Sequence, residues 1–164
     1  MLLSLDQLEG GIEFSADRSR VWAPAGWSLS KLTAALWEEG VSLINQGDVN
    51  PQALAGAIAT GTHGTGAALG SISTAARAFR LILADGSIVT CSENELPDLY
   101  QASRLSLGLT GVATRIEIDV LPAYHLEERI ESHPLAEIEE RWDELAATNR
   151  HVEFFVFPYG DRAA

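Results

Sequence analysis

The sequence predicts an α+β fold with a mainly antiparallel or mixed sheet and flanking helices. Its strongest local signal is a β-hairpin, in which apolar runs at 78–83 and 87–91 flank the dipeptide Asp85-Gly86. A second signal is strict alternation over 112–121, which is typical of a half-buried strand. Helical patterns lie between such short strands, and this mixture favours an α+β arrangement over a purely parallel one.

Two longer segments have helical periodicity. Residues 27–39 have leucines at helical spacing, a possible N-cap at Ser28 and a glycine at Gly40 where a helix commonly ends. Residues 134–149 combine an apolar stripe with a row of carboxylates, which we expect to face solvent rather than to take part in acid–base chemistry. A short apolar helix is also expected at 52–59.

The remaining elements are short. A short helix is expected with Pro97 in its first turn, where Ser92 and Glu95 resemble a capping box. Further strands are expected at 12–14, 20–24, 41–44, 124–132 and 151–158.

Composition and charge restrict the function. The 164 residues amount to about one domain, and 46% are apolar, which is enough for a core. The net charge of −12 argues against nucleic-acid binding, and no apolar run approaches the roughly 18 residues of a membrane span. The single Cys91 excludes a disulfide framework and favours a reducing compartment, so a cytoplasmic location is expected.

The most informative stretch runs from Asn45 to Gly66 and is dominated by glycine, alanine and threonine. Such a backbone can turn several N–H groups toward one point and bind an anion, usually phosphate. The spacing of Gly56 and Gly61 is that of a P-loop, but the lysine that this motif needs is missing, since the only lysine is Lys31. Spacing alone leaves two interpretations open, an anion-binding loop or a tight apolar turn.

The residues themselves resemble a known family. The run G-D-V-N-P-Q-A-L-A-G-A-I-A-T-G-T-H-G-T-G is similar to the FAD-binding core of the sugar-1,4-lactone and alditol oxidases, flavoproteins of the vanillyl-alcohol-oxidase type. The resemblance extends in one order along nearly the whole chain, through L-S-L-D-Q-L, L-I-L-A-D-G-S-I-V-T-C-S, P-D-L-Y-Q-A-S-R-L-S-L-G-L-T-G-V-A-T, L-P-A-Y-H-L and F-F-V-F-P-Y.

This resemblance implies FAD as the cofactor, bound mainly through backbone N–H and hydroxyl groups. The residues implied as contacts are Asp48, Ala53, Gly56, Thr60, Gly61, Thr62, His63, Gly64, Gly111 and Val112. A carboxylate suits phosphate poorly, so we expect Asp48 to hydrogen-bond loop N–H groups. His63 either contacts the cofactor or orders the loop, and its alternative is a packed loop histidine. The Gly-rich motif ending in His-Ser, through which several relatives attach flavin covalently, does not occur here, so any bound FAD is expected to be non-covalent.

The resemblance also implies a domain organisation. Residues 1–122 correspond to the second FAD-binding (PCMH-like) subdomain, and residues 123–164 to the start of the substrate domain. The chain is thus expected to be a truncated form, inactive alone, which contains no catalytic residues and can self-associate or bind a partner that supplies the missing domains.

Three other hypotheses remain. The chain could be a folded non-catalytic remnant or protein-interaction module without flavin. It could be a flavin subunit that is completed by another polypeptide. A free-standing phosphate or nucleotide binder is a third possibility.

Overall fold

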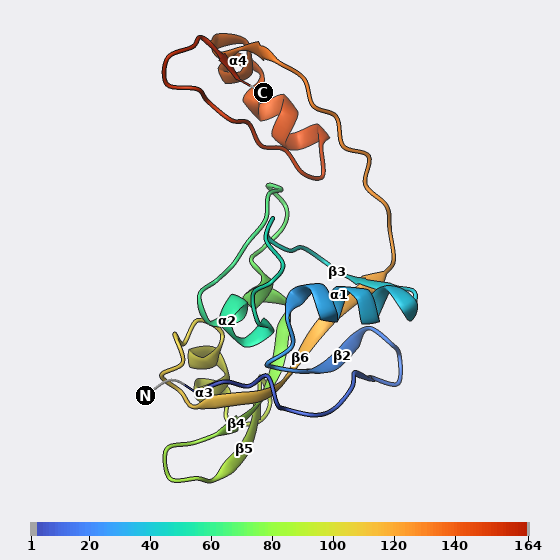
Figure 1. The fold of residues 1–164 in the computed structure, drawn as a ribbon, viewed down its shortest axis with the longest axis vertical. Helices are drawn as coiled ribbons and strands as arrows, with labels where there is room; N and C mark the ends of the chain where they lie inside the picture. Colours follow the sequence, from blue (N-terminus) through green and yellow to red (C-terminus); the bar gives the residue numbers. More distant parts are fainter. Residues whose placement is uncertain (1–2, 164) are drawn as a thin grey trace. The chain divides into compact units, whose positions relative to one another are not determined.

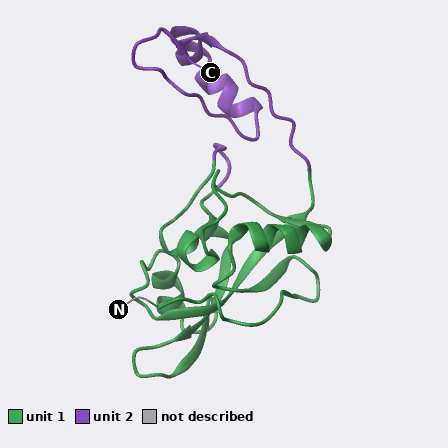
Figure 2. Ribbon diagram, in the orientation of Figure 1, with its two compact units in different colours: residues 1–64, 70–124 green, residues 65–69, 125–164 purple. Residues whose placement is uncertain are grey.

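The computed structural model describes residues 3–163, shown as a ribbon in Figure 1. The chain divides into two compact units, which are coloured separately in Figure 2. Unit 1 comprises residues 1–64 and 70–124, and unit 2 comprises residues 65–69 and 125–164. The chain leaves unit 1 after Gly64, near the end of the Gly-rich stretch, and returns to it at Gly70.

Unit 1 is built on an antiparallel sheet. Its strands are β1 (Glu13–Phe14), β2 (Arg20–Pro24), β3 (Val41–Leu43), β4 (Ala76–Ile82), β5 (Ile88–Ser92) and β6 (Val112–Pro122). Their order is β1-β2-β6-β4-β5, and β3 pairs with the end of β6. Every pairing in this sheet is antiparallel, so the predicted α+β class and the predicted hairpin between β4 and β5 are confirmed.

The helical elements of unit 1 are α1 (Leu29–Glu38), α2 (Leu54–Ala59), the 3-10 turn η1 (Ile72–Ala75) and α3 (Pro97–Ser103). Ser28 caps α1 as predicted, because its hydroxyl accepts a hydrogen bond from the Lys31 N–H at 3.2 Å. Gly40 follows α1 with φ +73°, a conformation that favours glycine.

The capping box predicted for α3 is wrong. The Ser92 hydroxyl accepts from the N–H groups of Asn94 and Glu95 and closes a turn, and α3 begins only at Pro97. The reason is that the left-handed Leu96, with φ +50°, separates this turn from the helix.

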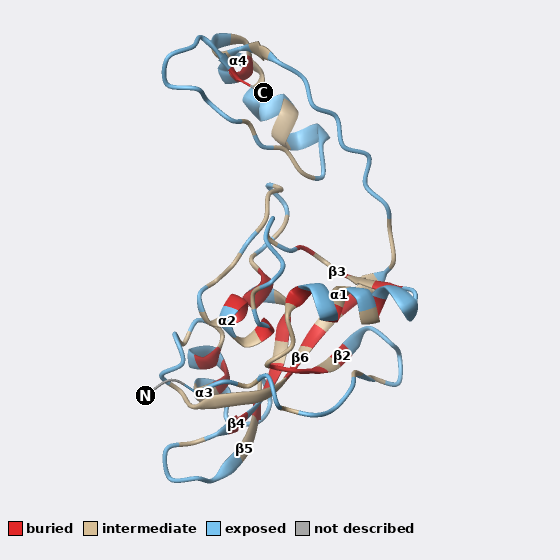
Figure 3. Ribbon diagram, in the orientation of Figure 1, coloured by how far each residue is buried: buried red, intermediate tan, exposed pale blue. Residues whose placement is uncertain are grey.

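One face of the sheet forms the core together with α1 and α2, as the buried segments in Figure 3 show. The alternation predicted for β6 is confirmed, since Ile116, Ile118 and Val120 are buried. The largest fully buried side chain of the core is Phe79 on β4. These residues give unit 1 a continuous apolar interior.

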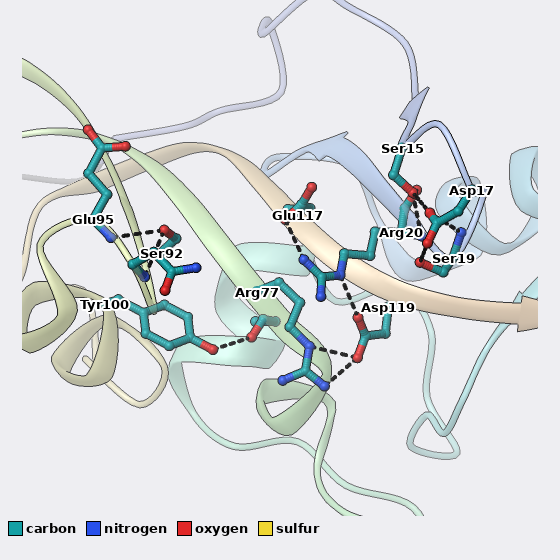
Figure 4. Close-up of polar contacts among 12 residues, drawn as sticks. Ser15, Asp17, Ser19, Arg20, Arg77, Ser92, Glu95, Tyr100, Glu117 and Asp119 are labelled. Atoms are coloured by element: carbon teal, nitrogen blue, oxygen red, sulfur yellow. Dashed lines mark hydrogen bonds and ion pairs between the residues drawn. The ribbon is translucent and has the colours of Figure 1, made fainter.

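The opposite face of the sheet carries a charge network (Figure 4). The register places Arg20 directly across from Asp119, whose carboxylate also accepts from the Arg77 Nε at 2.7 Å. This hydrogen bond raises the pKa of the Arg77 guanidinium above its ordinary value. Arg77 is thus held in a structural ion pair.

Unit 2 is smaller and consists of β7 (His133–Pro134), α4 (Leu135–Thr148) and β8 (Arg162–Ala163). β7 and β8 pair in an antiparallel ribbon, and α4 confirms the helix predicted at 134–149. The Trp142 ring meets Phe154 edge-on with centroids 5.2 Å apart. Across residues 3–163, no helix combines the length and the apolar character needed to cross a bilayer.

Two predicted strands are wrong, and both lie at the C-terminal end of the chain. Residues 125–132 are exposed and have no ladder partner, and 151–158 contains only an isolated bridge between Val156 and Ala163. Alternating or apolar residues become a strand only when another strand satisfies their backbone groups. Among the described residues of unit 2, only the two-residue strands β7 and β8 form a ladder.

Candidate functional site

The first part of the Gly-rich stretch is fixed to the segment that precedes α1. Ala53 forms a bridge with Ser28, and the Leu54 N–H donates to the Trp27 carbonyl at 2.8 Å. The Ala55 N–H donates to the Ala25 carbonyl at 2.9 Å. These bonds fix the N-terminal end of α2.

The three residues after α2 have their N–H groups already engaged. The N–H groups of Thr60, Gly61 and Thr62 all donate to carbonyls of α2, at distances of 3.1, 3.1 and 2.9 Å. Gly61 has φ +70°, so a side chain there would strain the backbone. In this conformation these predicted contacts shape the loop, and a ligand would reach their side chains or Cα atoms rather than their N–H groups.

Beyond Thr62 the loop runs against the segment that follows β3. A Cβ on Gly64 would lie 2.7 Å from the Asn45 Oδ1 and closer still to the Gln46 carbonyl oxygen. A Cβ on Gly47 would lie 3.1 Å from the His63 carbonyl oxygen. Two backbone segments approach so closely here that Gly64 is a steric requirement.

Polar side chains hold this arrangement, and two of them, Asn45 and Gln52, were not among the contacts expected from the sequence. The buried Asn45 accepts from the Gln46 N–H at 3.0 Å and donates to the Gly70 carbonyl at 3.2 Å. The Thr62 hydroxyl donates to the Gln52 Oε1 at 3.0 Å. In the sequence, Asn45 could have been recognised as a polar residue that directly follows a predicted apolar strand and begins the Gly-rich stretch.

Consecutive N–H groups remain available at His63 and Gly64. Among the hydrogen bonds of residues 3–163, none uses either of these two donors. The His63 side chain is exposed, and its Nδ1 lies 3.0 Å from the carbonyl oxygen of the adjacent Gly64. Two neighbouring backbone donors on an exposed, side-chain-poor loop fit a phosphate group.

The second predicted contact segment lies at the start of β6. Gly111 has φ +135°, and a Cβ there would lie 2.8 Å from the Ile82 carbonyl oxygen, so Gly111 packs against the end of β4. The loop before it reaches the α2 turn, because the Leu107 N–H donates to the Ala59 carbonyl at 3.2 Å. Leu105 lies next to Gly61. The structure thus joins the loop preceding Gly111 and Val112 to the Gly-rich turn.

Asp48 does not have the hydrogen bonds expected of it. Its side chain is exposed, and within residues 3–163 its carboxylate accepts no hydrogen bond from the loop. The N–H groups of Thr60, Gly61 and Thr62 already donate to α2 carbonyls and are not available to this carboxylate.

Three cationic side chains of unit 1 make contacts with other groups of the protein. The Lys31 Nζ lies 4.1 Å from the centre of the Trp27 ring, and the Arg104 Nε donates to the Ser73 carbonyl at 3.1 Å. Arg77 is paired with Asp119. These three side chains are already engaged, and the N–H groups of His63 and Gly64 are the donors that the loop itself offers to an anion.

Comparisons with known proteins show which family the chain belongs to. Residues 1–92 match the FAD binding domain family, and residues 116–164 match the D-arabinono-1,4-lactone oxidase family. An L-gulono-1,4-lactone dehydrogenase of Mycobacterium tuberculosis is 36% identical over 99% of this chain and 37% of its own length. A D-arabinono-1,4-lactone oxidase of Yarrowia lipolytica is 30% identical over 98% of this chain and 31% of its own length.

A solved structure shares the fold. The 6-hydroxy-D-nicotine oxidase of Arthrobacter nicotinovorans superposes with a TM-score of 0.62, at 23% identity, over 68% of this chain and 25% of the oxidase. The chain spans about a third of the length of the curated relatives it matches. The resemblance seen in the sequence is confirmed: the chain belongs to the FAD binding domain family, whose cofactor is FAD.

Proposed function

We propose that this chain supplies the FAD-holding part of an oxidoreductase that acts on CH–OH groups of sugar lactones or polyols. The names of the relatives and the match of residues 116–164 to the lactone oxidase family support this activity. In this proposal residues 1–122 are the second FAD-binding subdomain, and residues 123–164 begin the substrate domain. The bound flavin would supply the hydride-accepting chemistry.

The observation that supports FAD binding best is the pair of free backbone donors beside a sterically required glycine. The N–H groups of His63 and Gly64 would hold the pyrophosphate without covalent attachment. Gly56 is proposed as a further contact, because a Cβ there would meet nothing within 4 Å and a ligand can therefore approach its backbone. The remaining proposed contacts are Asp48, Ala53, Thr60, Gly61, Thr62, Gly111 and Val112.

Further polypeptide is part of this proposal. The chain spans about a third of the relatives' length, so we propose that the substrate site needs additional domains or a partner chain. Self-association through exposed apolar side chains such as Leu107 and Leu109 is a second possibility, which light scattering would test. We propose a cytoplasmic location, because the single Cys91 is unpaired and an unpaired thiol suits a reducing compartment. The Cys91 thiol is buried, and burial raises its pKa.

FAD titration followed by flavin fluorescence quenching tests the proposed function. Gly56→Ala should preserve the fold, since a methyl group fits there, but weaken FAD binding about tenfold by blocking close approach. Gly11→Ala is the matched control, because a Cβ at Gly11 also meets nothing within 4 Å and lies outside the proposed site. Saturable binding with this pattern supports the proposal, and the absence of quenching in protein that is folded by circular dichroism contradicts it.

A further inference from the structure

The residue that follows the free donors is fixed by a histidine from the far end of the chain. The His151 Nδ1 lies 3.2 Å from the Thr65 hydroxyl and 3.2 Å from the Thr65 carbonyl oxygen. Both residues belong to unit 2, although 86 positions separate them in the sequence. Thr65 is bonded directly to Gly64, so this contact acts on the backbone next to the proposed phosphate donors.

The neighbouring residue reinforces the contact. Gly66 has φ +107°, and a Cβ there would lie 2.5 Å from the Arg150 carbonyl oxygen. The main chain at Thr65 and Gly66 therefore lies directly against the main chain at Arg150 and His151. The Leu69 N–H donates to the Gly66 carbonyl at 3.0 Å and closes the loop tip into a turn.

Packing alone does not explain a histidine at this position. Its Nε2 is buried and has no hydrogen-bond partner within residues 3–163. A buried polar atom without a partner costs stability, and a phenyl ring would fill similar space without that cost. The benefit of the imidazole must therefore come from the Nδ1 contacts with Thr65.

We propose that His151 is a positioning residue for the cofactor loop. By holding Thr65 at residues 150–151, it restricts the backbone of the adjacent His63 and Gly64 and keeps their N–H groups ordered for an incoming phosphate. This inference rests on the proposed FAD site. Because binding energies are reciprocal, FAD bound at the loop also strengthens the contact between Thr65 and His151.

Amide hydrogen exchange of the full chain without FAD tests the contact itself. His151→Phe should speed exchange at residues 65–69 about fivefold, which corresponds to the loss of one ordinary hydrogen bond. Exchange in α4 should not become faster, because the phenyl ring keeps the packing and removes the unpaired Nε2. His151→Asn, whose amide can replace Nδ1, should restore most of the protection. Unchanged exchange at 65–69 in His151→Phe would overturn the proposal.

A control and a second variant sharpen the result. His125→Phe makes the same chemical change at an exposed position of unit 2 and should leave the loop unaffected. Thr65→Val removes the hydroxyl that faces His151. If these side chains act together, the effects of Thr65→Val and His151→Phe on exchange will be smaller in combination than their sum.

FAD affinity provides the functional readout. His151→Phe should raise the FAD Kd about fivefold relative to the wild type and the His125→Phe control. An equal Kd would overturn the positioning role. If the folded wild type binds no FAD, the proposed function fails by itself, and exchange at 65–69 then decides whether His151 orders the loop.

Discussion

The two units differ sharply in how much apolar surface they bury. Unit 1 has a continuous core in which Leu29, Leu32 and Leu36 of α1 are fully buried against the sheet. In unit 2 the buried apolar residues are Ile138 and Ala163, whereas Phe155 and Phe157 remain 61% and 59% exposed. Unit 1 therefore has its own source of stability, and unit 2 depends on a few specific contacts.

The largest expected effect is the loss of a large core side chain from unit 1. Phe79→Ala should lower the free energy of unfolding by about 3–5 kcal/mol, because it removes apolar contacts and leaves a cavity. Phe155→Ala makes the same change at an exposed position of unit 2 and should cost less than about 0.5 kcal/mol. Urea unfolding measures both, and equal losses would remove the contrast between the units.

The next effect concerns the loop that leads from one unit to the other. Gly64→Ala should destabilise unit 1 by about 1–3 kcal/mol, because its Cβ would overlap the Gln46 carbonyl and force the backbone apart. Gly11→Ala, which meets no neighbour, should be close to neutral. Thermal unfolding compares the two, and an unchanged melting temperature for Gly64→Ala would show that the close approach is not required.

A smaller effect is expected from the charge network on the sheet. Asp119→Asn should cost unit 1 about 1 kcal/mol, because it weakens the pairs with Arg20 and Arg77, whose side chains are 48% and 38% exposed and hence screened by solvent. Raising the salt concentration should shrink the difference from wild type. A difference that does not depend on salt would indicate a packing effect instead.

The smallest effect is a pH response confined to unit 2. The hydrogen bond to Glu131, with a second contact to Glu137, raises the pKa of His133 above its ordinary 6.5. The resulting stabilisation is present below pH 6.5 and is lost as the pH rises through the raised pKa. The NMR signal of the Trp142 indole should report loosening of α4 in that range, while signals of the unit 1 core stay constant.

Glu131→Gln is the matched variant for this pH response. It removes the main cause of the raised His133 pKa and should move the midpoint of the response to lower pH. An unchanged midpoint would contradict the assignment of the response to this pair.

Sequence reasoning succeeded where local patterns and tertiary packing agree. The alternating pattern of β6 buries one apolar face. The Asp85-Gly86 turn and the Ser28 cap satisfy backbone groups that lie close to them in the sequence. It failed at 124–132 and 151–158, because a strand needs a partner and the sequence does not reveal that unit 2 lacks a wider sheet.

The same limit applies to the candidate site. The Gly-rich stretch and its glycines could be predicted, because so many small residues in one short run are typical of a loop that lets a ligand approach the backbone. The bond from Asn45 to the Gly70 carbonyl and the contact between Thr65 and His151 could not, since both join residues that are brought together only by the fold.

The most direct test of FAD binding at the Gly-rich loop is amide exchange of the full chain with and without saturating FAD. We expect the cofactor to slow exchange at His63 and Gly64, the donors that are free in residues 3–163, and to leave the β4–β5 hairpin unchanged. Protection elsewhere with no change at these two amides would contradict the assignment of the pyrophosphate to this loop.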